Sequence, residues 1–268
     1  MSEVLVLGAT GTTGRRLTAA LQAQGHVVRA ASRGGPVPFD WARRDTWEPA
    51  VAGTDAVWLM APDGVDIDPE FVRLAVARGV RRLVLLSSGA VEEMGDQRLL
   101  SAERIVRTSG AAWTILRPSW FDQNFDEGFF APAVLAGEVV LPVGDLRQAF
   151  VDATDIASVA LIADGHEERT YEIRGPRALS FAEAVEVVAR ASGLPIRFGG
   201  SDDEYRAAQA ASGRGDDEVA GEIAAFAALR DRGDDPDGDD LVERLTGRPA
   251  TSFETYASRA AAAGAWAR

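Results

Sequence analysis

Short apolar segments alternate with amphipathic ones up to Pro118. The apolar segments cover residues 3–7, 27–31, 56–60, 82–87 and 113–116. Such short, nearly continuous apolar runs are typical of strands that are buried on both faces. The segments between them that show helical spacing cover residues 15–24, 68–78 and 99–108. This alternation predicts an α/β fold in which helices cover both faces of a parallel sheet.

The pattern becomes less regular after Pro118. We expect a helix and a turn over 128–142, helices over 152–163, 180–191 and 218–230, and a strand over 169–173. Ser180 and Glu183 have the spacing of a capping box at a helix start. We therefore expect a first domain over 1–150, with 151–165 packed back onto it. A smaller, mostly C-terminal α/β domain over 166–268 would bind the substrate.

Acidic residues are concentrated in one region of the C-terminal part. Residues 201–244 hold 14 Asp and Glu against 5 Arg. Within this region, 231–240 is rich in aspartate and glycine and has no sizeable apolar side chain apart from Pro236. A segment of this kind buries little apolar surface to offset its ordering entropy. We predict that 231–240 is a mobile acidic loop.

Composition excludes several kinds of chemistry. The 268 residues include no cysteine, and all 28 basic residues are arginine. Disulfides, thiolate catalysis and lysine Schiff bases are therefore excluded. The net charge of −13 disfavours nucleic acid as a partner. We also expect no metal site, because neither His26 nor His166 has a second ligand at metal spacing.

The hydrophobic pattern also predicts where in the cell the protein is found. No apolar run of about 18 residues exists, so we expect no membrane association. The N-terminus reads as a strand followed by a glycine loop, without the features of a signal peptide. These features predict a cytoplasmic protein, either a monomer or a homodimer.

A glycine-rich loop joins the first predicted strand to the first predicted helix. Gly8, Gly11 and Gly14 recur at intervals of three, and Thr10, Thr12 and Thr13 lie between them. Glycines permit a tight turn and a close approach of the backbone to a ligand, and the helix N-terminus presents free N–H groups to a pyrophosphate. The strand–loop–helix context makes this a dinucleotide-binding motif. The predicted fold is therefore a Rossmann-like, doubly wound parallel sheet.

The end of the second predicted strand indicates which dinucleotide binds. An NAD site usually places an acid there to bind the ribose 2′-hydroxyl. This chain has Ser32 and Arg33 instead. A guanidinium group matches a 2′-phosphate, so the sequence favours NADP(H) over NAD.

Five segments along the chain match the pattern of a known family. They are GATGTTGRRL, SRGG, GVRRLVLLSSGAV, AERIVRTSGAAWTILRPSWFDQNF and AFVDATDIASVA. Together and in this order they resemble the NmrA-like group of atypical short-chain dehydrogenases/reductases. The resemblance implies NADP(H) bound between a Rossmann domain and a smaller substrate domain. Members include reductases of secondary metabolism, quinone reductases and non-catalytic redox sensors. The ergot-type iminium reductases look most similar, because they share a Pro…Ser-Phe segment like residues 249–253.

Two arrangements of side chains that transfer protons in related enzymes are absent from this sequence. The Tyr-xxx-Lys pair of the broad superfamily needs a lysine, and Tyr171, Tyr205 and Tyr256 all follow the expected helix. Reductases similar to the isoflavone type place a lysine four residues before the position of Glu103, where this chain has Leu99. We expect Glu103 to be an exposed helix residue or a structural ion-pair partner.

Candidate site residues follow the predicted strands, because ligands bind at the carboxyl ends of strands in such sheets. For the cofactor these are the loop residues Gly8 and 10–14, together with Ser32, Arg33, Asp40, Trp41, Ala61, Pro62, Ser87 and Pro118. Asp40 and Trp41 would flank the adenine. Ser87, Ser88 and Asp122 are the catalytic candidates. The resemblance implies that Trp120, Phe121 and Asn124 line the substrate pocket.

These features predict an NADPH-dependent reductase of a small unsaturated molecule. Reduction of a carbonyl group develops an alkoxide that needs a proton donor, whereas hydride addition to an iminium ion neutralises an existing charge. We therefore expect imine, iminium, enone or quinone-like substrates, and an acidic pocket with Asp122 would favour a cation. A non-catalytic NADP(H) sensor and a cyclase or isomerase on the same fold remain alternatives.

Overall fold

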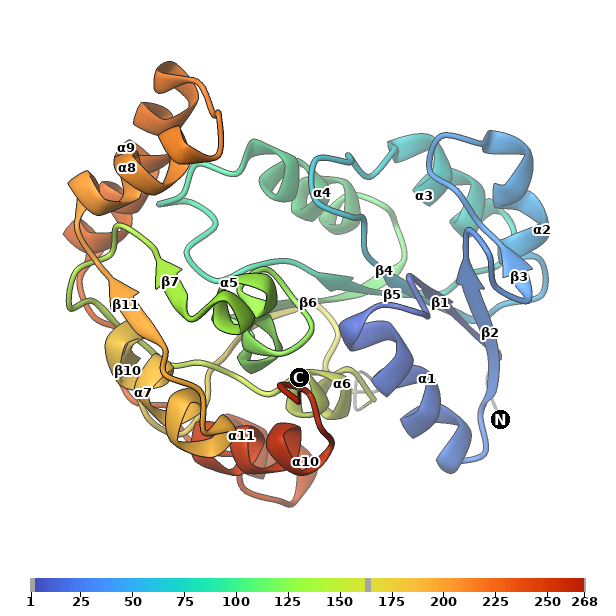
Figure 1. Ribbon diagram of the computed structural model, residues 1–268. Coiled ribbons are helices and arrows are strands. Elements are labelled where there is room, and N and C mark those ends of the chain that lie inside the picture. Colours follow the sequence, from blue (N-terminus) through green and yellow to red (C-terminus); the bar gives the residue numbers. More distant parts are fainter. Residues whose placement is uncertain (1–2, 162–164, 268) are drawn as a thin grey trace.

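The computed structural model describes residues 3–161 and 165–267 and contains a seven-stranded parallel sheet (Figure 1). The strand order is β3-β2-β1-β4-β5-β6-β9. The strands are β1 Glu3–Leu7, β2 Val27–Ser32, β3 Val37–Pro38, β4 Ala56–Leu59, β5 Arg82–Leu86, β6 Ala112–Pro118 and β9 Arg169–Ile173. The order reverses at β1, as in a doubly wound sheet. The five apolar segments therefore form the centre of the sheet, as predicted.

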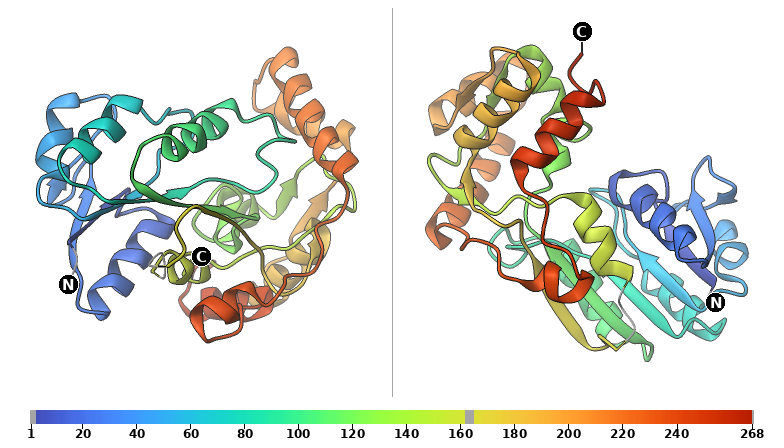
Figure 2. Two further views of the ribbon diagram at one scale, coloured as in Figure 1. Left: turned by 180° about the vertical axis from the view of Figure 1, so that it is seen from behind. Right: turned by 90° about the horizontal axis from the view of Figure 1, so that it is seen from below.

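Helices cover both faces of this sheet (Figures 1 and 2). Helices α1 Thr12–Ala23 and α6 Ala153–Leu161 share one core with the sheet, to which Leu17 and Ile156 contribute. Helices α2 Trp47–Val51, α3 Pro69–Ala77 and α4 Gln97–Arg107 share another, which contains Trp47 and Phe71. The short turn η1 Arg44–Thr46 precedes α2. The Rossmann-like fold is thus confirmed.

Local sequence signals account for two helix starts. At α3, the carboxylate of Asp68 accepts a hydrogen bond of 2.8 Å from the backbone N–H of Glu70. At α7 Phe181–Ser192, Ser180 and Glu183 form the expected capping box. Each cap satisfies a backbone donor that the helix itself leaves unpaired.

The remaining elements form a smaller unit at one end of the sheet (Figure 1). They are η2 Asp122–Phe125, α5 Ala131–Ala136, β7 Glu138–Val140, β8 Arg147–Gln148, β10 Leu179–Ser180, α7, β11 Arg197–Gly199, α8 Asp202–Ala211, α9 Asp216–Arg232, α10 Leu241–Thr246 and α11 Phe253–Ala262. Strand β7 pairs with β11, and β8 pairs with β10. Buried aromatic side chains, including Phe125, Phe130, Phe150 and Phe181, fill the core of this unit. Helix α10 instead packs with the α1 and α6 core.

The two units do not divide at residue 166 as expected. Strand β9, which follows that boundary, pairs in parallel with β6 and is the seventh strand of the main sheet. Phe125 and Phe130, which precede the boundary, belong to the core of the smaller unit. The chain therefore crosses between the units more than once. The end of the helix expected over 152–163 lies outside the described residues.

The acidic segment over 231–240 is held by hydrogen bonds, contrary to the expectation of a loop without partners. Asp235 is buried, and its carboxylate accepts hydrogen bonds from the Ser119 hydroxyl at 3.0 Å and the Ala149 N–H at 3.2 Å. The carboxylate of Asp237 accepts a 2.7 Å bond from the Ala178 N–H. The reasoning from apolar burial missed that aspartates can dock a segment by accepting bonds from a neighbouring backbone. Among the described helices, none is long and apolar enough to cross a membrane.

Candidate active site

The glycine loop forms a tight turn between β1 and α1. Gly8 has a φ of +64°, and a Cβ there would lie 2.5 Å from the Met60 sulfur. A Cβ on Gly14 would overlap the carbonyl oxygen of Gly8. The first and third glycines are therefore required by the backbone of the turn and its packing, independently of any ligand.

The N-terminus of α1 is open at this turn. Gly11 is its cap residue and makes no side-chain bond. No group within the described chain accepts a hydrogen bond from the N–H groups of Thr12 or Thr13. Free N–H groups at a helix start form a binding site for an anion. The loop thus fits the pyrophosphate of a dinucleotide, as the sequence indicates.

A cavity of about 780 Å³ extends from this loop across the sheet. It is bordered by the carboxyl ends of five strands. These ends contribute Gly8 from β1, Met60, Ala61 and Pro62 after β4, Ser87, Ser88 and Gly89 after β5, Pro118, Ser119 and Trp120 at β6, and Glu172 and Arg174 at β9. The cavity therefore lies where open α/β sheets bind their ligands.

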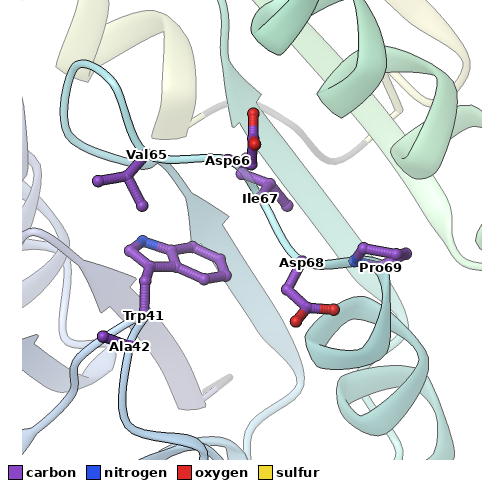
Figure 3. Close-up of a pocket in the computed structure, with 7 residues that line it drawn as sticks. All are labelled: Trp41, Ala42, Val65, Asp66, Ile67, Asp68 and Pro69. Carbon is purple, nitrogen blue, oxygen red and sulfur yellow. The ribbon is translucent and has the colours of Figure 1, made fainter.

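The predicted adenine side has a separate pocket of about 430 Å³. It is lined by Trp41, Ala42 and residues 65–69, and Figure 3 shows the Trp41 ring beside Val65. The Trp41 indole donates a 3.3 Å hydrogen bond to the Met60 carbonyl, which connects this pocket to the larger cavity. The carboxylate of Asp40 accepts a bond from the Ala42 N–H and stabilises the same turn. The assignment of the adenine to this place stays a prediction.

Ser32 and Arg33 lie at the end of β2, outside both cavities. Ser32 is half-buried, and its carbonyl accepts the N–H of Phe39 at 3.1 Å. Arg33 is exposed and pairs with no acid among the described residues. Its guanidinium is therefore available to a ligand at this edge. Thr10, in the glycine loop, is also exposed.

Ser87 belongs to a buried network of hydrogen bonds and ion pairs. Its hydroxyl donates a 2.7 Å hydrogen bond to Glu103, which has no exposed surface. Arg117 donates to the same carboxylate from two nitrogens at 2.8 Å, and Arg107 lies at 2.9 Å. Burial raises the pKa of Glu103, but the bonds from Arg117 and Ser87 outweigh it and leave the pKa below its ordinary value.

This network changes the role of Ser87. Its only proton is used within the network, so the geometry contradicts its assignment as a proton donor to substrate. Glu103 is the ion-pair partner that the sequence analysis offered as one alternative. The Ser88 hydroxyl donates to the Gly89 carbonyl at 3.0 Å, a local bond that a ligand could displace.

Asp122 does not border the cavity, which contradicts its assignment as a catalytic or substrate-binding residue. Its side chain is fully buried in the turn η2, and neither carboxylate oxygen has a hydrogen-bond partner among the described residues. Burial and the neighbouring Asp152 and Asp155 raise the pKa of Asp122 well above its ordinary value. Burial therefore favours the protonated form of this carboxyl group over the charged one. Its neighbours Phe121 and Asn124 do border the cavity.

Aromatic side chains form the wall of the cavity next to β6. The Trp120 ring stacks on Phe130 with ring centroids 5.9 Å apart, and it meets Phe181 edge-on at 5.2 Å. Phe121 pairs by its backbone with Val151 and packs into the core beneath α6. Trp120 and Phe121 thus join the structural core while presenting a surface to the cavity, and their role in substrate binding stays a prediction.

An ion pair links this loop to the glycine loop. Arg16, in the first turns of α1, donates a 2.7 Å hydrogen bond to Glu127, and Arg15 pairs with the same carboxylate. Glu127 lies between the cavity residues Asn124 and Phe129. The pairs hold the loop 122–130 against the start of α1.

None of the three tyrosines borders the cavity. The Tyr171 hydroxyl contacts the His166 ring nitrogen at 2.6 Å, Tyr205 donates to Glu222, and Tyr256 donates to Asp126. Because the chain also has no lysine, no Tyr, His or Lys side chain lines the cavity within the described residues.

Sequence reasoning missed the residues that line the far side of the cavity. Phe226, Leu229 and Arg232 lie on one face of α9 and border it, as do Arg98 and Arg174. Arg174 directly follows β9, so the strand-end rule identifies it once β9 is placed in the main sheet. Arg232 has no comparable signal, because it comes from a helix of the smaller unit.

The cavity is not strongly acidic. Asp63, Asp96, Glu172 and Asp235 border it, and so do Arg98, Arg174 and Arg232. The four acids and three arginines nearly balance each other, which contradicts the expectation of an acidic pocket. Most of the acids over 201–244 lie elsewhere. No group of three or more His, Asp or Glu side chains in the described ranges could hold a metal ion.

The open glycine turn and its cavity agree with a match to a known family model. The model is described as NAD(P)H-binding and matches residues 8–163, more than half of the chain. The chain belongs to the NAD(P)H-binding family. The family assignment confirms the resemblance to atypical short-chain reductases and the binding of a nicotinamide cofactor.

Two of the relatives with similar sequences are named as reductases, and a third is named as a synthase. The chain is 34% identical to (4-alkanoyl-5-oxo-2,5-dihydrofuran-3-yl)methyl phosphate reductase of Streptomyces griseus, with 97% of this chain and 98% of the relative covered. It is 32% identical to an NAD(P)H azoreductase of Xenophilus azovorans, covering 97% and 98%. It is 31% identical to festuclavine synthase I of Penicillium roqueforti, covering 95% and 96%.

Solved structures share the fold at lower identity. The chain resembles an NADPH-dependent quinone oxidoreductase of Escherichia coli complexed with NADPH, with a TM-score of 0.71, 22% identity and coverage of 96% and 99%. At this identity the likeness shows the fold alone.

Proposed function

We propose that this protein is an NADPH-dependent reductase of small unsaturated molecules. The observation that carries the proposal is the cavity that joins the open glycine loop to the aromatic wall at Trp120 and Phe121. A bound nicotinamide cofactor supplies a hydride. The residues of this chain hold the cofactor, position the acceptor and exclude water.

The cofactor would lie along the strand ends. The N–H groups of Thr12 and Thr13 would bind the pyrophosphate, and Ala61, Pro62 and Pro118 would border the nicotinamide side. At the other end, Ser32 and the unpaired Arg33 would bind a 2′-phosphate. NADPH would then be preferred over NADH, because no acid stands there to bind a free 2′-hydroxyl.

No Tyr, His or Lys side chain of the described chain lines the cavity to act as a general acid, and this limits the substrate. Removing a positioned general acid costs about 10²–10⁴ in rate when an alkoxide develops. Hydride addition to an iminium ion creates no such charge, and the charge on a reduced enone or quinone is delocalised. We therefore propose imine, iminium, enone or quinone-like substrates, with water as the source of any proton.

The names of the relatives are consistent with this class. One is named for a phosphorylated dihydrofuranone that carries an alkanoyl group, and another for azo compounds. Both kinds of molecule have a polarised or conjugated double bond. The smaller unit would shape the substrate side, because Phe226 and Leu229 of α9 face the cavity.

The test is an assay of NADPH absorbance over a matched panel. The panel holds a dihydroisoquinolinium ion, menadione, an azo dye, an alkanoyl dihydrofuranone methyl phosphate with its free alcohol, and cyclohexanone. We expect turnover of at least one unsaturated compound and little of cyclohexanone. Gly11→Trp, which blocks the loop, should abolish NADPH binding and turnover while circular dichroism shows an intact fold.

Three results would contradict the proposal. If cyclohexanone were the fastest substrate, the argument from the missing donor would be wrong. If NADPH bound tightly and nothing turned over, a non-catalytic sensor would replace the reductase. Conversion of a compound without NADPH oxidation would indicate a cyclase or isomerase.

A further inference from the structure

Two arginines on the substrate side of the cavity have unused hydrogen-bonding capacity. Arg174 and Arg232 both border the cavity, and about a quarter of each side chain is exposed. The Nε of Arg232 is buried without a hydrogen-bond partner among the described residues. Arg174 makes no hydrogen bond there either, and Glu172, its nearest acid, lies 3.8 Å away. Arg98, on the same cavity, is bonded to Asp96 at 3.2 Å.

Hydrogen bonds of Ser119 link the chain segments that carry the two arginines. The Ser119 N–H donates a 2.9 Å bond to the carbonyl of Ile173, the residue before Arg174. The Ser119 hydroxyl donates to Asp235, which also pairs with a terminal nitrogen of Arg232. Ser119 thus connects the backbone beside Arg174 to the acid that holds Arg232.

The neighbouring acids position these arginines and leave donors free. Both carboxylate oxygens of Asp235 accept hydrogen bonds, from Ser119 and Ala149 on one oxygen and from Arg232 on the other. Asp235 fixes one side of the Arg232 guanidinium and leaves the Nε side unbonded. Glu172 lies between Arg117 at 3.6 Å and Arg174 at 3.8 Å, beyond hydrogen-bond distance of both.

This pair lies too far from the glycine loop to serve the cofactor's pyrophosphate. Strand β9 is four strands from β1 in the order β1-β4-β5-β6-β9. At about 4.8 Å between strands, the separation is about 19 Å. Trp120, Phe226 and Leu229 contribute apolar surface to the same cavity.

We propose that Arg174 and Arg232 form an anion subsite for the substrate of the proposed reductase. The substrate would place its unsaturated, apolar part against Trp120 and α9, and a phosphate monoester or carboxylate at the two guanidinium groups. This inference rests on the proposed function for the identity of the site. It adds an anionic group to the unsaturated group of the expected substrate, because an unpaired buried donor favours an acceptor with negative charge.

The experiment compares an alcohol with two of its anionic esters on one scaffold. The alkanoyl dihydrofuranone methyl alcohol is assayed beside its phosphate and its hemisuccinate. We expect at least one anionic compound to have a kcat/KM about tenfold above that of the alcohol. The better of the two identifies phosphate or carboxylate as the preferred group. Equal values for all three compounds would overturn the subsite.

Variants assign the effect to these residues. In Arg174→Gln, the ratio of kcat/KM for the preferred anion to that for the alcohol should fall about tenfold. Arg232→Gln should act in the same direction, with NADPH binding as the check that it folds. The control is Arg190→Gln on α7, an exposed arginine paired with Glu186, which should keep the parent ratio. An unchanged ratio in both Arg174→Gln and Arg232→Gln would contradict the assignment.

A binding measurement separates this inference from the proposed function. Calorimetric titration of the same three compounds into the protein loaded with NADP⁺ requires no turnover. Tighter binding of an anion than of the alcohol, lost in Arg174→Gln, would support the subsite even if no compound were reduced. Turnover of all three without any preference in binding would support the reductase and reject the subsite.

Discussion

At the scale of single residues, Arg33 determines the cofactor preference that we propose. One charge-assisted guanidinium–phosphate interaction contributes about 1.5–3 kcal/mol, which corresponds to about 10–150-fold in affinity. NADPH should therefore bind at least about tenfold tighter than NADH. Arg33→Ala should remove most of this difference, and Arg73→Ala, on the exposed face of α3, should not. Fluorescence titration with both cofactors measures it, and equal affinities in the parent protein would reject the assignment.

The burial of Asp122 predicts how the free energy of unfolding depends on pH. Because burial raises the pKa of Asp122 in the folded protein, the folded state holds its proton more tightly than the unfolded state, whose Asp titrates near 3.9. The free energy of unfolding should therefore fall as pH rises above about 4, until the folded pKa is passed.

Asp122→Asn removes this titration. The variant should therefore be more stable than the parent at pH 8, and the difference should be much smaller at pH 4. Urea unfolding at both pH values tests it, with Asp203→Asn on exposed α8 as the control. A parent protein with the same pH dependence as Asp122→Asn would contradict the account.

Individual residues differ in how far the sequence could place them. Gly8 and Gly14 could be assigned because their role depends on the adjoining strand and helix alone. Ser87 was placed correctly at a strand end, but its proton goes to Glu103, a partner 16 residues away that only the packing of α4 brings near. Asp122 was misassigned because the turn η2 directs it inward while Phe121 and Asn124 border the cavity.

At the scale of elements, the acidic segment after α9 shows how polar groups can replace an apolar anchor. Asp235→Ala would leave the Ser119 hydroxyl, the Ala149 N–H and Arg232 without their acceptor. Each buried donor left unpaired costs about 1–3 kcal/mol. We expect the parent segment to resist cleavage by a protease specific for aspartate, and the variant to be cut within 233–240.

The control for this experiment is Asp231→Asn, an exposed position in the last turn of α9. It should be cut no faster than the parent. Equally rapid cleavage of the parent and Asp235→Ala would restore the sequence-based expectation of a mobile loop. The sequence could not reveal this anchor, because its donors come from residues 119 and 147–149, which are brought close only in the folded chain.

At the scale of the whole molecule, the sheet explains what the sequence predicts well and what it does not. Strands β1, β2, β4, β5 and β6 could be predicted because each is a local apolar run, and their ends give most of the cofactor side. Strand β9 was recognised as a strand but assigned to the wrong unit, since its pairing with β6 is not encoded locally. Because β9 was assigned to the smaller unit, the sequence analysis did not identify Arg174 or the substrate side of the cavity.

The proposed reductase activity requires hydride transfer from NADPH to the substrate within this cavity. The direct measurement uses NADPH deuterated at C4 on one face or the other and mass spectrometry of the product. The substrate is the panel compound that is reduced fastest with formation of a new C–H bond, because deuterium on oxygen or nitrogen would exchange with water. We predict one deuterium in the product from one labelled form and none from the other. No reduced product while NADPH stays bound, or a product without deuterium from either form, would contradict the reductase.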